Sequence, residues 1–359
     1  MWTLRQALSA ASAACLLMNA WCQPAAAQSA CTSMQVLLSI SPNHREDVMS
    51  YIAPKLKQDL GVTLVAEAIG SANMVDRVAA QAAAPRISIA QWDVPIGVAA
   101  CERDICAPID LSRIPNARHL EDWAYSRDAS GRLVVLAAGA VGVGFLYNAD
   151  DFAKHHIAPP TSWTDLNKAD VAGRLGLTAP QSTMGTAALV MMARLHGGGE
   201  ANIDPGFAET KTILAHKNTV FTWSSEMSNL LQLGDLWMAV NSSNLAQGLR
   251  AQGLPIRFVW PAEGSPAVNF GISLVKGAPC EEAAYEYLNL YFTPEFQAMR
   301  MRNGGGLSSA ADAWKLLTPQ QLSDLELTPD DLHKLVSLDW RAINRNRPDW
   351  IDRWQREVR

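Results

Sequence analysis

The chain has 359 residues, of which 48% are hydrophobic and 18% are charged. That length accommodates two domains, and the composition is that of an ordinary globular protein. The formal net charge of −5, without a long basic run, argues against a general nucleic-acid-binding protein.

The first 30 residues differ from the rest of the chain. Arg5 is followed by an apolar run rich in Ala and Leu, and Ala25 and Ala27 then form an A-x-A pattern. This order predicts a secretory signal peptide over residues 1–27 that is cut after Ala27. The alternative of a membrane anchor needs a longer apolar stretch. We therefore expect a soluble mature protein in the periplasm.

Export places the remaining cysteines in an oxidising compartment, where disulfides persist. Two of the six cysteines fall in the predicted signal peptide and four remain, which is an even number. Cys101 and Cys106 are five residues apart, and we favour a disulfide between them. A second pairing, Cys31 with Cys280, follows if the other two also pair. A zinc site is the alternative, but no His lies at ligand spacing from the close pair.

Strand and helix patterns alternate from residue 34 onward. Short apolar runs predict strands, and apolar residues at helical spacing predict the helices between them, the first of which ends at Gly61. The predicted order is strand 34–41, helix 45–61, strand 62–69, helix 70–84 and strand 86–92. This alternation predicts an α/β fold with a mostly parallel sheet and helices on its faces.

Two long extended passages, residues 133–149 and 255–277, stand apart from this alternation. They enclose a compact block of further strands and helices, so they predict two lobes joined by two crossing strands. The first passage contains Gly139, Gly142 and Gly144. A P-loop needs a Lys after its glycines, and a dinucleotide loop opens a helix; neither holds here. We interpret these glycines as hinge residues that permit close backbone approach.

Catalytic chemistry has little support in the sequence. The G-x-S-x-G elbow of hydrolases is missing, and His155 and His156 lie in a polar segment that we expect to be solvated. Glu281 and Glu282 open a helix, where they complement its dipole. The Trp- and Arg-rich C-terminal segment reads as a helix that packs its Trp face on the body, or alternatively as an interaction tail. We predict no catalytic residue, metal or cofactor.

Polar and aromatic residues gather where strands give way to helices. In an open α/β sheet, ligands bind beyond the carboxyl ends of the strands, and free N–H groups at helix N-termini favour an anionic group. The predicted ligand-binding residues at these junctions are Ser41, Asn43, Ser71, Asn73, Gln91, Trp92, Asp93, Ser182, Thr183, Trp223, Ser224, Asn241 and Ser242.

The order of several segments resembles the periplasmic solute-binding proteins of ABC transporters, on the spermidine/putrescine-binding branch. The resemblance covers residues 34–359, and its main segments are 105–116, 139–150, 161–166, 233–264 and 283–305. It implies a type II periplasmic-binding-protein fold with two α/β lobes, each a mixed, mostly parallel sheet, and a two-strand hinge.

The resemblance also implies bounds and partners. Lobe 1 would comprise residues 31–138 and 268–310, and lobe 2, including the hinge strands, residues 139–267. The helices of residues 311–359 would pack on the lobes. The protein would be a monomer without enzymatic activity that binds a small solute and meets an ABC permease in the inner membrane.

The pocket departs from the polyamine-binding pattern of that branch. Asn269 and Phe270, which we add to the predicted ligand-binding residues, stand where an aromatic residue and an acid are expected, and Thr183 replaces another acid. Asp93 is the acid that remains in the junction segments, apart from Glu226 at the rim. A dication with unpaired charges is disfavoured in a closed cleft, so we predict an anionic or zwitterionic solute and not a polyamine.

Three alternatives stay open at this point. The protein could be a polyamine-binding member of the same family, or a sensor that presents its solute to a membrane receptor. An enzyme on the same fold would need a free thiol at Cys106, or Asp93, as its reactive group.

Overall fold

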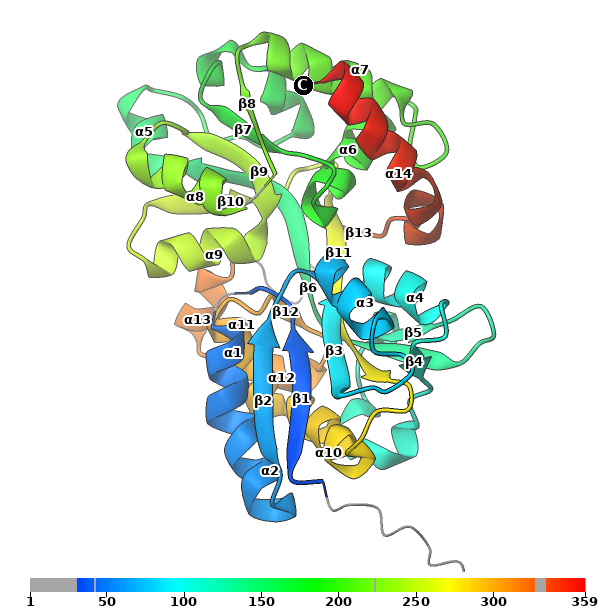
Figure 1. Ribbon diagram of the computed structural model, residues 1–359. Coiled ribbons are helices and arrows are strands. Elements are labelled where there is room, and N and C mark those ends of the chain that lie inside the picture. The colour runs from blue at the N-terminus through cyan, green and yellow to red at the C-terminus, as the bar shows by residue number, and fades with distance from the viewer. Residues whose placement is uncertain (1–30, 42, 223, 327–333, 359) are drawn as a thin grey trace, which may run out of the picture. The chain divides into compact units, whose positions relative to one another are not determined.

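Two lobes joined by crossing strands are visible in Figure 1, a computed structural model that describes residues 31–41, 43–222, 224–326 and 334–358. The predicted signal peptide (1–27) and Trp223 lie outside the described residues. Residues Thr32–Arg359 cluster as one unit. The described residues include no helix that is both long enough and apolar enough to traverse a lipid bilayer.

Lobe 1 is built on parallel strands whose arrowheads point toward lobe 2 (Figure 1). The strands of its sheet, in spatial order, are β2 (Thr63–Ala68), β1 (Ser33–Leu38), β3 (Ile87–Asp93), β11 (Ser265–Val275) and β6 (Leu133–Asn148). β2, β1 and β3 are parallel, and β11 runs antiparallel to β3 and β6. The short strands β4 (Cys106–Ala107), β5 (Tyr125–Arg127) and β12 (Leu307–Ser308) pair with β11 or β6 in lobe 1, whereas β13 (Leu335–Val336) pairs with the lobe 2 end of β11. β3 is buried along nearly its whole length, as expected of a central parallel strand.

Helices cover this sheet on its two faces. They are α1 (His44–Asp47), α2 (Ala53–Leu60), α3 (Ser71–Ala79), α4 (Val94–Cys101), α10 (Glu281–Tyr291), α11 (Pro294–Arg302), α12 (Ala311–Trp314) and α13 (Pro319–Asp324). The predicted end of the first long helix is confirmed: Gly61 has φ 70°, a left-handed conformation that closes the helix at low cost for glycine.

Lobe 2 has a second sheet, which is built on the C-terminal half of β6. Its strands are β10 (Ile256–Val259), β9 (Met238–Ser242), β7 (Leu175–Thr178) and β8 (Thr219–Phe221). Of these, β7, β8 and β9 are parallel to one another. Its helices are α5 (Ala149–Lys154), α6 (Thr183–Leu195), α7 (Asp204–Ala215), α8 (Ser224–Leu233), α9 (Ser243–Ala251) and α14 (Trp340–Glu357). α6 is buried on nearly all sides, which fits its apolar sequence.

The C-terminal helix α14 is anchored in lobe 2. Ile343, Trp350 and Trp354 are buried within the lobe 2 core, and the ring of Trp354 lies 6.1 Å from that of Phe207. The Trp-rich face therefore packs on the body of the protein, as the helical interpretation of this segment predicted.

The two crossing strands are β6 and β11. They pair with each other antiparallel from Ile272 opposite Leu136 to Ala267 opposite Gly142, with a register shift between Phe270 and Gly271. β6 then continues into lobe 2 beside β9 and β10. This confirms the predicted two-strand hinge. The predicted lobe boundaries at residues 138/139, 267/268 and 310/311 stay a prediction.

The glycines of β6 serve packing within the hinge. A Cβ at Gly142 would lie 2.1 Å from the indole ring of Trp260, and one at Gly144 would lie 2.4 Å from the carbonyl oxygen of Val259. A side chain at either position would therefore collide with the returning chain. The residues that exclude a side chain there are Val259, at the end of β10, and Trp260, which follows it.

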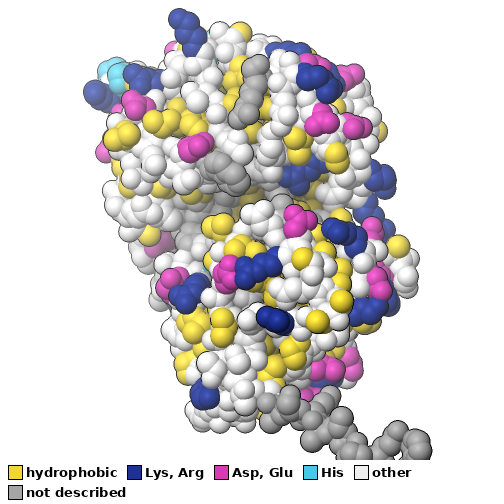
Figure 2. Space-filling view, in the orientation of Figure 1, with side chains coloured by type: hydrophobic (Ala, Val, Ile, Leu, Met, Phe, Trp, Pro, Cys, Tyr) yellow, Lys and Arg dark blue, Asp and Glu magenta, His cyan; other side chains and the backbone are white. Residues whose placement is uncertain are grey.

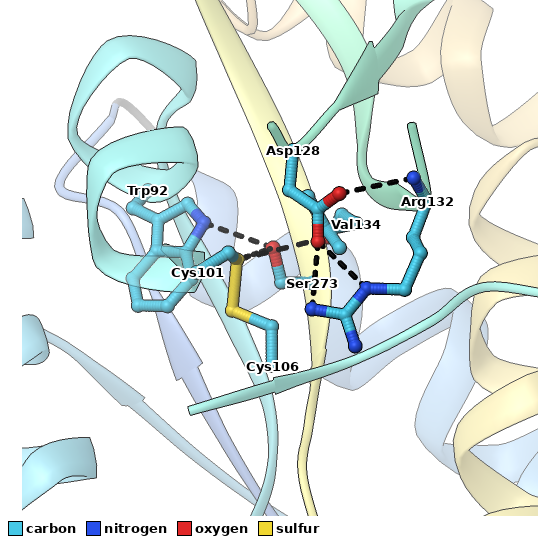
Figure 3. The surroundings of a disulfide bond; sticks show 7 residues. All are labelled: Trp92, Cys101, Cys106, Asp128, Arg132, Val134 and Ser273. Atoms are coloured by element: carbon cyan, nitrogen blue, oxygen red, sulfur yellow. Dashed lines mark hydrogen bonds and ion pairs between the residues drawn. A yellow bond between two sulfur atoms is a disulfide. The ribbon is translucent and has the colours of Figure 1, made fainter. Parts of the chain in front are cut away.

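The predicted disulfide between Cys101 and Cys106 is confirmed (Figure 3). It fastens the end of α4 to β4 beside the buried Trp92 and Ser273. Because Cys106 carries no free thiol, the thiol-dependent enzyme alternative fails. The pairing of Cys31 with Cys280 stays a prediction.

Candidate functional site

The carboxyl ends of the parallel strands of both lobes meet at the boundary between the lobes (Figure 1). Hydrogen bonds cross this boundary at several places, two of them beside the strand ends. Thr183 Oγ1 donates to Asp93 Oδ2 over 2.7 Å, and Gln247 Nε2 donates to the carbonyl oxygen of Met301 over 2.9 Å. Asn43 and Asn303 of lobe 1 line a hollow of about 590 Å³ together with Gln247 of lobe 2. We call the region from this hollow to the bond between Thr183 and Asp93 the interlobe cleft, and it is the candidate site.

Asp93 stands at the end of β3 and directly before α4. Its backbone N–H donates to Ser71 Oγ, at the start of α3, over 3.0 Å. Burial raises the pKa of the Asp93 carboxyl, and this is opposed by the hydroxyl of Thr183, the positive charge of Arg347 and the hydroxyl of Ser71. The starts of α3, α4 and α6 thus converge on one carboxylate.

The other predicted lobe 1 residues follow β1 and β2. Ser41 is partly buried and accepts a hydrogen bond from Arg300 Nη2 over 3.0 Å. Asn43 is exposed in a left-handed conformation (φ 52°), and its Nδ2 donates to the carbonyl oxygen of Asn303 over 3.4 Å. Asn73 is exposed on the first turn of α3. These side chains lie on the side of lobe 1 that faces lobe 2, and their role in ligand binding stays a prediction.

A buried ion pair lies behind Ser41. Arg300 and Asp47 are each 6% exposed in their side chains and form a salt bridge, and Asn303 Nδ2 donates to the second carboxylate oxygen over 2.6 Å. Each oxygen of the carboxylate therefore has a partner, which such a buried charge requires. The pair joins α11 to α1 and fixes the loop that carries Ser41.

His44 continues this network as a neutral side chain. Its Nδ1–H donates to the carbonyl oxygen of Ser39 over 3.0 Å, and its Nε2 accepts from the hydroxyl of Tyr291 over 3.0 Å. Burial first and the positive charge of Arg300 second lower the pKa of His44 to about 3. Burial raises the pKa of Tyr291, so its hydroxyl keeps its proton.

A small cavity of about 20 Å³ opens beside this network. Ser41, His44, Gly139, Phe270 and Arg300 contribute to its walls. Such a volume holds about one water molecule. An organic solute does not fit there, so the network positions the edge of the cleft and does not itself enclose a ligand.

Two predicted residues face the interior of lobe 1 instead of the cleft. Trp92 is fully buried, and its indole N–H donates to Ser273 Oγ over 3.1 Å beside the disulfide (Figure 3). Gln91 is buried and accepts a hydrogen bond from Tyr287 over 3.1 Å. Successive side chains of a strand alternate between its faces, but β3 is covered on both faces, so neither residue reaches the cleft. We leave both out of the site proposed below.

Lobe 2 brings neutral polar groups to its edge of the cleft. Ser182 caps α6 by accepting the N–H of Met184, and Thr183 is buried against Asp93. The buried Asn241 Nδ2 donates to Thr178 Oγ1 over 3.1 Å and to Ser224 Oγ over 3.2 Å.

The rest of the lobe 2 edge continues from Asn241. Its Oδ1 accepts from the N–H of Ser242, whose hydroxyl donates to Asn244 over 2.6 Å. These bonds hold the ends of β7 and β9 to the starts of α8 and α9. Asn269 and Phe270 of β11 are partly exposed within the crossing strands.

Sequence reasoning missed three of the residues that organise the site. Arg300 and Asp47 are 253 positions apart, and no local pattern signals their pairing. Arg347 had a signal: Ile343, Arg347, Trp350 and Trp354 recur at helical spacing, so one charged side chain shares the buried face of α14. Its Nη2 donates to the carbonyl oxygen of Gln181 over 2.9 Å.

The sequence matches the model of one protein family over residues 51–323, which is most of the chain. That family is described as "Bacterial extracellular solute-binding protein". The chain belongs to this family. The resemblance to periplasmic solute-binding proteins is thereby confirmed.

Curated relatives match shorter parts of the chain, and their sequence identity to it is low. A putative 2-aminoethylphosphonate-binding periplasmic protein of Salmonella typhimurium is 26% identical over 219 residues, which is 58% of this chain and 58% of the relative. The spermidine/putrescine-binding periplasmic protein of Escherichia coli K12 is 26% identical over 173 residues, 47% of this chain and 49% of the relative. The chain therefore spans 58% or less of the length of these two relatives.

Solved structures share the fold with this family member. The periplasmic binding protein AfuA from Actinobacillus pleuropneumoniae, solved with fructose-6-phosphate, has a TM-score of 0.72 at 20% identity and covers 91% of this chain and 98% of its own. An ABC transporter substrate-binding protein from Bradyrhizobium japonicum has a TM-score of 0.75 at 16% identity, covering 91% and 100%. These similarities support the two-lobed fold.

Proposed function

We propose that this protein captures a small anionic or zwitterionic organic solute in the interlobe cleft and delivers it to an ABC permease. It would act in the periplasm, as a monomer and without enzymatic activity. The cleft residues we retain are Ser41, Asn43, Ser71, Asn73, Asp93, Ser182, Thr183, Ser224, Asn241, Ser242, Asn269 and Phe270, with Trp223 as a predicted member outside the described residues.

The observation that carries this proposal is the state of Asp93. A polyamine needs carboxylates that are free to pair with its ammonium groups. Asp93 already accepts a hydrogen bond from Thr183 and lies in the field of Arg347. Burial disfavours its charged form, and the groups that oppose this effect belong to the protein, so Asp93 offers a dication little further stabilisation.

The remaining groups at the cleft favour an anion. The first turns of α3, α6 and α9 begin at the cleft, and the partial positive charge of a helix N-terminus stabilises anionic groups there. The side chains around them are hydroxyls and amides, which donate hydrogen bonds to anionic oxygens. A phosphonate or carboxylate satisfies such donors, whereas an ammonium group competes with them.

The relatives narrow the class of solute without fixing it. One carries a name for 2-aminoethylphosphonate, and one fold neighbour was solved with a sugar phosphate. Both ligands carry an anionic phosphorus group. Other relatives are named for spermidine and putrescine, so a polyamine is the candidate against which the proposal is tested.

A thermal-shift and calorimetry panel tests the proposal on residues 28–359. The panel comprises 2-aminoethylphosphonate, fructose 6-phosphate, amino acids, small organic acids, spermidine and putrescine. A solute at about one hundred times its Kd stabilises the folded state by about 2.7 kcal/mol, which raises Tm by several degrees. We expect such a shift from a zwitterionic or anionic compound. A shift with spermidine or putrescine and none with any anion contradicts the proposal.

A further inference from the structure

The C-terminal helix contacts both lobes. It is anchored in lobe 2 by its buried tryptophans, yet Asn344 Nδ2 donates to the carbonyl oxygen of Pro95 in α4 of lobe 1 over 2.8 Å. One turn earlier, Arg341 Nη2 donates to the carbonyl oxygen of Arg127 over 3.3 Å. In Figure 2, Lys and Arg side chains (dark blue) gather along the right-hand edge, where the two lobes meet.

Arg347 lies one turn after Asn344 and points toward the start of α6. Its Nε and Nη2 donate to the carbonyl oxygens of Pro180 and Gln181 over 3.3 and 2.9 Å. These bonds fix the guanidinium to lobe 2. Thr183, two residues after Gln181, donates to Asp93 Oδ2 of lobe 1, so the guanidinium lies in the neighbourhood of that carboxyl, although the two described side chains form no direct ion pair. Burial lowers the pKa of Arg347, and the negative charge of Asp93 raises it.

Asp93 therefore receives its compensation from the opposite lobe. The groups that act on it are Ser71 of α3, Thr183 of α6 and Arg347 of α14, and Arg347 is the charged one among the described residues. Thr183 and Arg347 both belong to lobe 2. In an arrangement with the lobes apart, the carboxylate would have water in place of these two partners.

We propose that Arg347 is a positioning residue for lobe closure: the C-terminal helix supplies it as the counter-charge of Asp93, and Asp93, Thr183 and Arg347 together form a bridge that stabilises the closed arrangement. This rests on the proposed function in one respect, namely that closure encloses the solute. The C-terminal helix is thereby part of the closing mechanism, in addition to packing on lobe 2.

The geometry explains why three groups are needed. A carboxylate that loses water pays a large desolvation cost, and one neutral hydroxyl offsets little of it. A cation held at a fixed position by two carbonyl oxygens adds attraction without having to be reordered. The hydrogen bond from Asn344 to the carbonyl oxygen of Pro95 holds α14 against the start of α4.

The test measures closure without any solute, so that its result is independent of the proposed function. Double electron–electron resonance measures the interlobe distance between spin labels at Ser50→Cys in lobe 1 and Thr212→Cys in lobe 2. Both positions are exposed. The labelled protein is compared with Arg347→Met and Arg347→Lys in the same background. Arg356→Met is the matched control, because Arg356 is an exposed arginine on the same helix.

We expect Arg347→Met to lower the ratio of closed to open protein about fivefold near pH 7.5. Arg347→Lys, which keeps the charge, restores most of it, and Arg356→Met leaves it unchanged. The difference between Arg347→Met and the labelled protein in the ratio of closed to open molecules becomes smaller as the pH falls through the pKa of Asp93, because a protonated carboxyl needs no counter-charge. In an Asp93→Asn background the same substitution has little effect.

Three results would overturn the proposal. The first is a wild-type distribution without a closed population, and the second is an equal loss in Arg347→Met and Arg356→Met. The third is a deficit that persists unchanged at acidic pH or in the Asp93→Asn background. If Arg347→Met does not fold, Thr183→Val replaces it, since it removes the other lobe 2 partner. An unchanged closed fraction in that variant counts against the bridge.

Discussion

The two edges of the cleft are built from different chemistry. Behind the lobe 1 edge lies a buried network with an ion pair, Arg300 with Asp47, and a neutral His44. The lobe 2 edge relies on neutral groups, centred on Asn241 and Thr178. Charged groups in low dielectric interact strongly and tolerate no missing partner, whereas neutral hydrogen bonds contribute about 1 kcal/mol each. Lobe 1 therefore holds its edge rigidly but is vulnerable to the loss of one group.

The largest effect is expected from Asp47→Ala, because it leaves the Arg300 charge buried without its carboxylate. Breaking a buried pair costs about 3–5 kcal/mol in the free energy of unfolding. Urea unfolding followed by circular dichroism measures this loss. Asp59→Ala, at an exposed position on α2, is the control and should change stability by less than about 0.5 kcal/mol.

A double variant sharpens the result. Asp47→Leu combined with Arg300→Met removes both charges, and apolar replacement of a buried pair is often neutral. We expect it to recover most of the stability that Asp47→Ala loses. Equal stability of Asp47→Ala and Asp59→Ala would show that the ion pair does not hold lobe 1.

The next effect is an acid instability confined to lobe 1. His44 takes up a proton below its ordinary pKa of 6.5 when unfolded but only near about 3 when folded. The unfolded state therefore binds more protons, and stability falls as the pH drops from 6.5 toward 3. At pH 5 the loss amounts to about 2 kcal/mol.

Hydrogen exchange by mass spectrometry at pH 7 and pH 5 measures this effect lobe by lobe. Peptides of α1 and α11 should lose protection at pH 5 more than peptides of α6 and β9. His44→Gln should flatten the pH dependence, whereas His119→Gln, at an exposed position of lobe 1, should not. An equal loss in both lobes would contradict the comparison.

The smallest effect is expected on the lobe 2 edge. Asn241→Ala removes the bonds to Thr178 and Ser224 and leaves neutral groups that reorganise, at a cost of about 1–2 kcal/mol. Thermal unfolding of this variant beside Asn229→Ala, an exposed position on α8, measures it. A loss as large as that of Asp47→Ala would remove the distinction between the two edges.

Sequence alone predicted the fold of this protein better than the residues of its candidate site. Apolar periodicity and the long run of residues 133–149 located the parallel strands and the hinge, since both depend on local patterns. Trp92 and Gln91 were misplaced because a strand end does not reveal which faces are covered. Arg300 and Asp47 escaped because their pairing depends on the fold that brings α11 to α1.

The antiparallel pairing of β6 with β11 has a mechanical consequence. Six residues of each strand face one another at the crossing, from Ile272 opposite Leu136 to Ala267 opposite Gly142, with a register shift between Phe270 and Gly271. A ladder of hydrogen bonds resists shear in its own plane but bends readily out of it. The lobes are thus joined by a paired two-stranded ribbon and not by two independent tethers, so bending out of its plane is the deformation that the ribbon opposes least. Trp260, packed over Gly142, travels with that ribbon.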